Sequence, residues 1–333
     1  MTEHRNIPLP EDGKPRQPTL LERAESALGI GGFKPASVPR NLAPPVNRQV
    51  RRERDAQPAV ASAAQPAGTA DAPGPAVRAA APVRDLPPVR FTHPVCTVDR
   101  QRLAHHGLIS PGVHAGALLE EFRIVKRNLV QAARDAAARG EGARAQRILV
   151  SSPLPGEGKT FTAANVALAL AAEKDLEVVL VDADFAKPSL LSMFGLPKGP
   201  GLMDALANPA IAVEDCVIPT DLDGLHVLPA GGQTNSDSEY LTSDRTAQVL
   251  DRLTQGSPNR LVVFDTAPAL AASHAAELAK HVGQAVVVAR ADRTGQSALE
   301  DTLSLLSRCR DLKLLLNAAH FSPSGRRFGA YYE

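Results

Sequence analysis

Residues 151–160 read Ser151-Ser152-Pro153-Leu154-Pro155-Gly156-Glu157-Gly158-Lys159-Thr160. An apolar run at 147–150 precedes this stretch, and a helical pattern at 161–172 follows it. A strand, a glycine-containing turn and a helix that begins at Gly-Lys-Thr are the layout of a nucleotide phosphate loop. Backbone N–H groups of the turn and the dipole of the helix would both favour phosphate oxygens. The stretch therefore predicts a nucleotide site.

The residues of this loop have distinct predicted roles. Lys159 would reach the β- and γ-phosphates, and the Thr160 hydroxyl would take one Mg²⁺ position. The loop departs from the pattern G-x-x-x-x-G-K-[ST], because Pro153 stands in place of the first glycine. Asn317, at the end of the last expected strand, either contacts adenine or caps a loop. The predicted nucleotide-binding residues are Pro155, Gly156, Glu157, Gly158, Lys159, Thr160 and Asn317.

Aspartates follow two other strand patterns. Asp182 and Asp184 come after one buried-strand pattern, and Asp265 comes after another. In an open parallel sheet, ligands bind beyond the carboxyl ends of the strands, so these carboxylates should meet the phosphate loop in one crevice. Aspartates at strand ends can also simply cap the helices that follow them. Because all three features occur together, we expect Thr160, Asp182 and Asp265 to hold Mg²⁺.

Composition narrows the class of protein. The chain has 333 residues, 44% of them apolar, which suffices for one α/β domain of ordinary size plus flexible sequence. A formal net charge of +1 argues against nucleic acid as a partner. Cys96, Cys216 and Cys309 form no C-x-x-C pair, which argues against a disulfide scaffold or a structural zinc site. No stretch approaches the roughly twenty apolar residues that cross a bilayer.

The residue types divide the chain into three segments. Residues 1–90 predict a disordered Pro/Ala-rich arm, because they hold too few large apolar side chains to offset the entropy of ordering. Within the arm, a capping box and an apolar stripe predict a short helix at 19–28, either a docking helix for a partner or a transient one. Residues 91–320 predict the globular domain, and residues 321–333 predict a flexible tail.

Strand and helix patterns alternate along the globular domain. This alternation, with Val- and Leu-rich strands, predicts an α/β fold of the P-loop NTPase type: a mostly parallel sheet with helices on both faces. The expected strands lie near 147–152, 177–182, 225–229, 260–265, 284–290 and 312–317. The expected helices lie near 97–106, 116–139, 159–173, 238–256, 272–282 and 295–309.

These features resemble the bacterial tyrosine kinases (BY-kinases) that govern exopolysaccharide and capsule synthesis, particularly the autokinases encoded with exosortase-linked export systems. Residues 120–126, Glu120-Glu121-Phe122-Arg123-Ile124-Val125-Lys126, look like the family's E-x-x-R-x-x-R helix. Tyr331-Tyr332 matches its C-terminal tyrosine cluster. The resemblance runs from about residue 107 to the C-terminus and rests also on residues 155–160, 181–184 and 263–268.

The resemblance implies an ATP-dependent protein-tyrosine autokinase that uses Mg²⁺. It implies that Tyr331 and Tyr332 are the phosphoacceptors, and we expect Asp184 to accept the tyrosine proton. The catalytic set would be Lys159, Asp182, Asp184 and Asp265.

The resemblance also implies partners. Glu120, Arg123 and Lys126 would pack neighbouring subunits into a homo-oligomer, in ring form, with phosphorylation in trans. A membrane-embedded adaptor for polysaccharide chain length or export would hold this cytoplasmic chain at the inner face of the plasma membrane.

Two positions depart from patterns of related proteins. Leu154 occupies the place of the interface lysine of septum-positioning and chromosome-partitioning ATPases, which lowers the weight of that class. Ala186 replaces an arginine common in the kinases, with Lys187 beside it. A nucleotide-switched assembly ATPase of the same system, with little or no kinase activity, therefore remains the alternative.

Overall fold

The computed structural model describes residues 87–110, 112, 116–234 and 236–319. The predicted arm up to residue 86, its helix at 19–28, and the tail with Tyr331 and Tyr332 lie outside the described residues. Within the described ranges, no helix is both long enough and apolar enough to span a bilayer.

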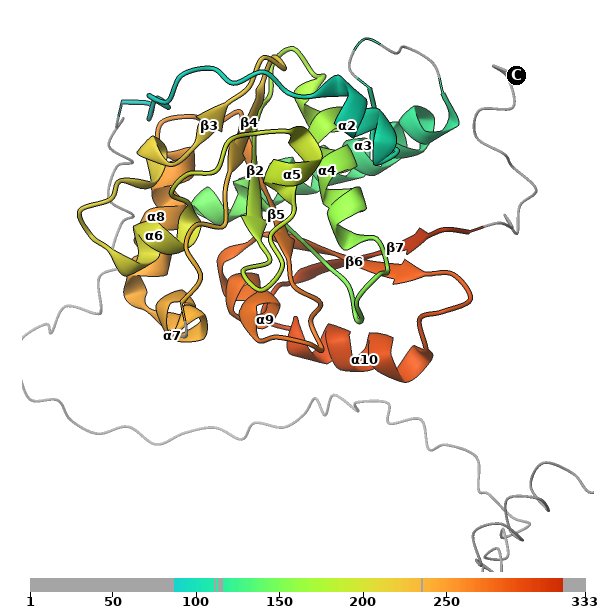
Figure 1. Ribbon diagram of the computed structural model, residues 1–333. Helices are drawn as coiled ribbons and strands as arrows, with labels where there is room; N and C mark the ends of the chain where they lie inside the picture. The colour runs from blue at the N-terminus through green and yellow to red at the C-terminus, as the bar shows by residue number, and fades with distance from the viewer. Residues whose placement is uncertain (1–86, 111, 113–115, 235, 320–333) are drawn as a thin grey trace, which may run out of the picture. The chain divides into compact units, whose positions relative to one another are not determined.

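A seven-stranded sheet forms the centre of the domain, in the order β3-β4-β2-β5-β1-β6-β7 (Figure 1). Neighbouring strands pair in parallel except β3, which is antiparallel to β4. The predicted mostly parallel sheet is confirmed, whereas β3 is not predicted, because two residues carry no periodic pattern. The strands are β1 (Arg147–Ser151), β2 (Glu177–Ala183), β3 (Ile218–Pro219), β4 (Leu225–Leu228), β5 (Arg260–Thr266), β6 (Gln284–Arg290) and β7 (Asp311–Asn317).

The helices follow the expected order with one correction. The single helix expected at 238–256 is wrong: Ser243 is extended, with φ −72° and ψ 153°, and separates two helices. Two short helices, α5 and α6, are also absent from the sequence prediction. The helices are α2 (Arg100–His105), α3 (Ala117–Ala138), α4 (Lys159–Ala171), α5 (Leu190–Phe194), α6 (Leu202–Ala207), α7 (Asp237–Thr242), α8 (Asp244–Thr254), α9 (His274–Leu278) and α10 (Gln296–Leu305).

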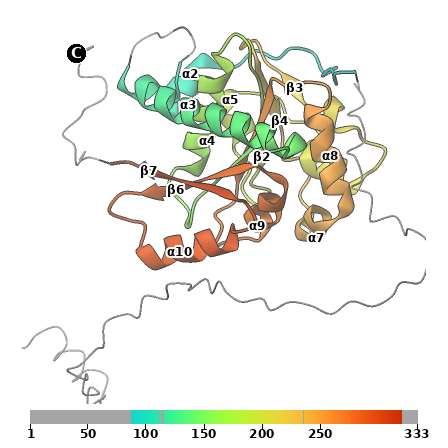
Figure 2. The ribbon, with the colours of Figure 1, turned by 180° about the vertical axis from the view of Figure 1, so that it is seen from behind.

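Helices cover both faces of the sheet, as predicted (Figures 1 and 2). Side chains alternate along the strands, so Ile148 and Val150 join one apolar core and Leu149 joins the other. Helices α2 to α5 pack on the first core, and α6 to α9 pack on the second. Helix α4 is buried on nearly all sides, because it lies between the sheet and α3. This burial fixes the helix that begins at Lys159.

An extended segment ahead of α2 is bound to the sheet. Cys96 forms an isolated bridge beside β3. The Arg260 guanidinium donates to the Val89 carbonyl at 2.9 Å and lies 4.3 Å from the centroid of the Phe91 ring. Arg260 also forms an ion pair with Glu177 on β2. The packed part of the chain therefore includes Val89, just ahead of residue 91.

Candidate active site

The phosphate loop connects the end of β1 to the start of α4 and depends on two glycines in left-handed conformation. Gly156 has φ +79° and Gly158 has φ +99°, a region that other residues rarely adopt. A Cβ atom at Gly158 would lie 2.1 Å from Asn317 Nδ2. Gly158 is also the residue that caps α4, so the loop conformation and the helix start are set together.

Lys159 contacts two of the predicted site residues. Its Nζ lies 2.8 Å from Asp184 Oδ2 and 3.2 Å from Thr160 Oγ1. The Lys159 side chain is 13% exposed and that of Asp184 8% exposed, so the pair is largely shielded from water. The structure thus brings Lys159, Thr160 and Asp184 together.

Asp182 organises the turn between β2 and α5. Its Oδ2 accepts backbone N–H groups of Ser189 at 2.9 Å and Leu190 at 3.0 Å, and its Oδ1 accepts that of Asp184 at 3.3 Å. Burial raises the pKa of Asp182 to about 6, against the effect of these three donors. Oδ1, with one long hydrogen bond, retains acceptor capacity toward a cation.

Asp265 is fully buried and lies opposite Asp182 in the pairing of β2 with β5. Among the described residues, no hydrogen bond of ordinary geometry reaches either carboxylate oxygen, although the Thr160 hydroxyl lies close enough to lower the pKa of Asp265. Burial raises the pKa of Asp265 to about 7, although the Lys159 cation opposes the shift. A buried carboxylate with only the Thr160 hydroxyl near it has acceptor capacity left for a ligand or a water. Mg²⁺ prefers one or two carboxylates with the rest of its shell from phosphates and water. The donor set of Thr160, Asp182 and Asp265 therefore fits Mg²⁺.

Glu157 and Asn317 hold the loop itself. The Glu157 side chain is fully buried, and its Oε2 accepts the backbone N–H of Leu154 at 2.7 Å. Asn317 Nδ2 donates to the Glu157 carbonyl at 2.9 Å. Of the two roles considered for Asn317, this contact supports loop capping.

Two residues beside the loop are missing from the sequence prediction. Arg290 Nη1 donates to the Gly156 carbonyl at 3.1 Å, and the Thr294 hydroxyl bonds to Glu157 Oε1. Both lie at or just beyond the carboxyl end of β6, the same sheet edge that carries the aspartates. The polar stretch Arg290-Ala291-Asp292-Arg293-Thr294 at a predicted strand end was the signal that would have found them.

Sequence comparisons agree with this geometry. A family model described as ParA, NUBPL iron-transfer P-loop NTPase, matches residues 144–255. A putative tyrosine-protein kinase EpsB of Ralstonia solanacearum is 33% identical over 184 residues, 55% of this chain and 24% of that protein. The tyrosine-protein kinase YwqD of Bacillus subtilis is 28% identical over 196 residues, 59% of this chain and 78% of that protein. Over about half of its length, this chain is similar to bacterial tyrosine-protein kinases.

Two solved structures share the fold. The chimerical protein CapA2B2 matches with a TM-score of 0.53 and 26% identity, over 67% of this chain and 94% of that one. The BceF tyrosine kinase domain matches with a TM-score of 0.50 and 27% identity, over 59% of this chain and 76% of that one. The chain spans about a quarter of the length of EpsB.

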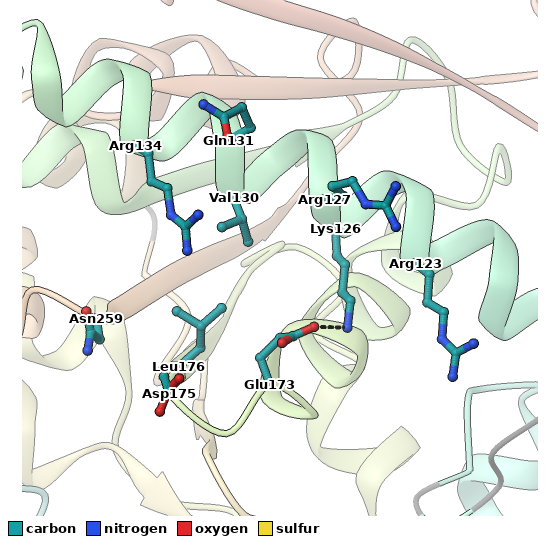
Figure 3. Close-up of a pocket in the computed structure, with 10 residues that line it drawn as sticks. All are labelled: Arg123, Lys126, Arg127, Val130, Gln131, Arg134, Glu173, Asp175, Leu176 and Asn259. Atoms are coloured by element: carbon teal, nitrogen blue, oxygen red, sulfur yellow. Dashed lines mark ion pairs between the residues drawn. The ribbon is translucent and has the colours of Figure 1, made fainter.

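The residues predicted to form the subunit interface lie away from the phosphate loop. Glu120, Arg123 and Lys126 are on α3, and Glu120 forms an ion pair with Arg123. Lys126 forms an ion pair with Glu173 (Figure 3). It also donates to the Ala169 carbonyl at 3.3 Å, near the end of α4 opposite Lys159. A cation at this position also stabilises the C-terminus of α4.

A cavity of about 430 Å³ lies beside these interface residues. Helix α3 supplies its basic side chains, and the α4–β2 connection supplies its acidic ones (Figure 3). Its lining residues are Arg123, Lys126, Arg127, Val130, Gln131, Arg134, Glu173, Asp175, Leu176 and Asn259.

Proposed function

We propose that the chain is an ATP-dependent protein-tyrosine kinase that phosphorylates its own C-terminal tyrosines, Tyr331 and Tyr332. The observation that carries this proposal is the convergence of Lys159, Thr160, Asp184 and the buried Asp265 at one end of the sheet. The names of the relatives support the same chemistry. Autophosphorylation would regulate polymerisation and export of an exopolysaccharide or capsule.

The mechanism begins with the contact between Lys159 and Asp184. The loop amides and Lys159 would hold the phosphates of ATP, so Lys159 would exchange Asp184 for phosphate oxygens. That exchange leaves Asp184 Oδ2 without its cation and able to accept a proton. Nucleotide binding would therefore prepare the base.

Phosphoryl transfer then requires orientation more than basicity. The tyrosine oxygen bonds to the γ-phosphorus while the bond to the β–γ bridging oxygen breaks; ADP leaves, and the tyrosine proton passes to Asp184. Ionising tyrosine fully at pH 7 costs about 4 kcal/mol, but in a loose transition state the proton leaves late. Bound Mg²⁺, held by Thr160, Asp182 and Asp265, would neutralise charge on the phosphates.

Packing between subunits would deliver the tail to a neighbouring site. Glu120, Arg123 and Lys126 are the proposed contacts of a ring-forming homo-oligomer, with transfer in trans. Arg123→Glu should lower both the oligomer mass and the rate of autophosphorylation, whereas the matched surface change Arg308→Glu should alter neither. A fully oligomeric and active Arg123→Glu protein would remove this part of the proposal. A membrane-embedded adaptor for polysaccharide chain length or export would recruit the assembly to the inner face of the membrane.

The deciding experiment is a phosphotyrosine assay of the purified chain with Mg-ATP. Wild type should label, and both Lys159→Met and the double change Tyr331→Phe/Tyr332→Phe should not. Phosphotyrosine that still forms in the Tyr331→Phe/Tyr332→Phe protein would mean that the acceptor is another residue. Wild type that binds ATP without labelling would favour the nucleotide-switched assembly ATPase, which the loss of a guanidinium at Ala186 already supports.

A further inference from the structure

The phosphate loop contains a buried carboxylate, which an anion-binding loop does not need for its chemistry. Glu157 lies between Gly156 and Gly158, and its side chain is fully buried. A buried negative charge beside phosphate groups is unfavourable unless fixed partners hold it. The partners of Glu157 therefore indicate what it does.

The Glu157 carboxylate connects the loop to a second segment. Oε2 accepts the N–H of Leu154 at 2.7 Å, across the loop, and Oε1 bonds to the hydroxyl of Thr294 on the β6–α10 connection. The Glu157 carbonyl accepts Asn317 Nδ2 at 2.9 Å. Residue 157 is thus held from within the loop, from the β6–α10 connection and from the end of β7.

The direction of the Thr294 hydrogen bond is fixed. Thr294 Oγ1 accepts the backbone N–H of Arg290 at 2.7 Å. A hydroxyl has one proton, so the proton of Thr294 is left to donate to the Glu157 carboxylate. The turn that presents Thr294 is tight: Arg293 N and Thr294 N both donate to the Arg290 carbonyl, at 3.2 and 3.0 Å.

We infer that Glu157 and Thr294 are positioning residues that brace the phosphate loop in the conformation that receives the phosphates of a nucleotide. The inference rests on the nucleotide binding in the proposed function. Gly156 and Gly158 give the loop freedom to adopt many conformations, and the brace removes that freedom before the ligand arrives. Thr294 acts through Glu157 and is not itself a catalytic residue.

Thr294→Val and Thr294→Ser test the brace, with a fluorescent non-hydrolysable ATP analogue and Mg²⁺ as the probe. Valine keeps the shape and removes the hydroxyl, and serine restores it. We expect Thr294→Val to weaken analogue binding about tenfold, or about 1.4 kcal/mol, and Thr294→Ser to bind within about twofold of wild type. In the kinase assay, valine should raise KM for ATP and leave kcat largely unchanged, because the brace acts on binding. Equal binding by wild type and valine overturns the inference, and so does equal loss in valine and serine.

Glu157→Gln separates bracing from charge repulsion and remains informative if Thr294→Val does not fold. The amide accepts only one of the two hydrogen bonds, so bracing predicts weaker analogue binding. If Glu157 mainly repels phosphate, Gln binds more tightly, which overturns the inference. If wild type does not bind the analogue, the proposed function itself is overturned. If wild type and Thr294→Val bind the analogue equally well, only the inference is overturned.

Discussion

Lys159 Nζ and Asp184 Oδ2 lie 2.8 Å apart in a largely shielded ion pair. Asp184 Oδ1 also accepts the backbone N–H of Lys187 at 3.1 Å. The residue proposed as the base is therefore held by the residue proposed to bind phosphate. The proposed base, Asp184, and the proposed phosphate-binding residue, Lys159, therefore cannot act independently of each other.

Asp184→Asn separates the two functions. We expect ATP affinity to be kept or to rise, because Lys159 no longer has to leave a carboxylate, and phosphotransfer to fall by about a hundredfold or more. Analogue titration and initial rates of phosphotyrosine formation measure the two quantities, with the exposed change Asp175→Asn as control. Loss of ATP binding would instead make Asp184 a metal ligand or a structural residue.

Asp265 gives the domain a pH-dependent stability. Its pKa is raised to about 7 in the fold, so the native carboxyl keeps its proton over a range where the unfolded chain has lost it. The native state then binds more protons, and stability falls as pH rises from about 4 to 7. Melting curves in EDTA from pH 5 to 8 should show this loss in wild type and a shallower slope in Asp265→Asn. Parallel slopes would contradict an ionisable Asp265.

The pH dependence of stability that Glu177 contributes has the opposite sign. Burial alone would raise its pKa, but hydrogen bonds from His226 and Arg260 outweigh burial and lower the pKa to about 2. The stability from this group is present above about pH 4.3 and is lost as pH falls toward 2. Because the side chain is 33% exposed, we expect Glu177→Gln to cost only about 1–2 kcal/mol at pH 7, and less at pH 4. Urea unfolding at the two pH values measures this, and an equal cost at both would argue against an ionised Glu177.

Gly158→Ala should disable the loop without unfolding the domain. The added Cβ meets Asn317 Nδ2 and the backbone is left-handed there, so we expect at least about a tenfold loss of analogue binding. Gly199→Ala, where a Cβ meets open space, is the matched control. Unchanged binding in Gly158→Ala would show that the loop adapts.

The sequence predicted the main strands and the carboxylates at their ends, because buried strands are long apolar runs and parallel strands end at one edge. It did not predict β3, α5 or α6, which are too short for a periodic pattern. The sequence did contain an indication of the break between α7 and α8, because serine is a preferred residue at the position before a helix. The helical apolar pattern continues across Ser243, however, and therefore predicted one helix. The directions of side chains are a second feature that could not be predicted from the sequence. That Glu157 points inward to Thr294, or that Asp182 accepts three N–H groups, depends on the folded turn and not on residue spacing.

The hydrogen bond from the Asn317 side chain to the Glu157 carbonyl of the phosphate loop has a kinetic consequence. Tyr331 follows Asn317 by fourteen positions in the sequence, so the proposed phosphoacceptor is tethered within about 45 Å of a fixed point beside the loop. A tethered substrate has an effective concentration set by linker length, in the millimolar range for short flexible linkers. In the proposed oligomer, the supply of acceptor to a neighbouring site is then set by the packing of the subunits and the length of the tail. The expression level acts only through the amount of chain that assembles.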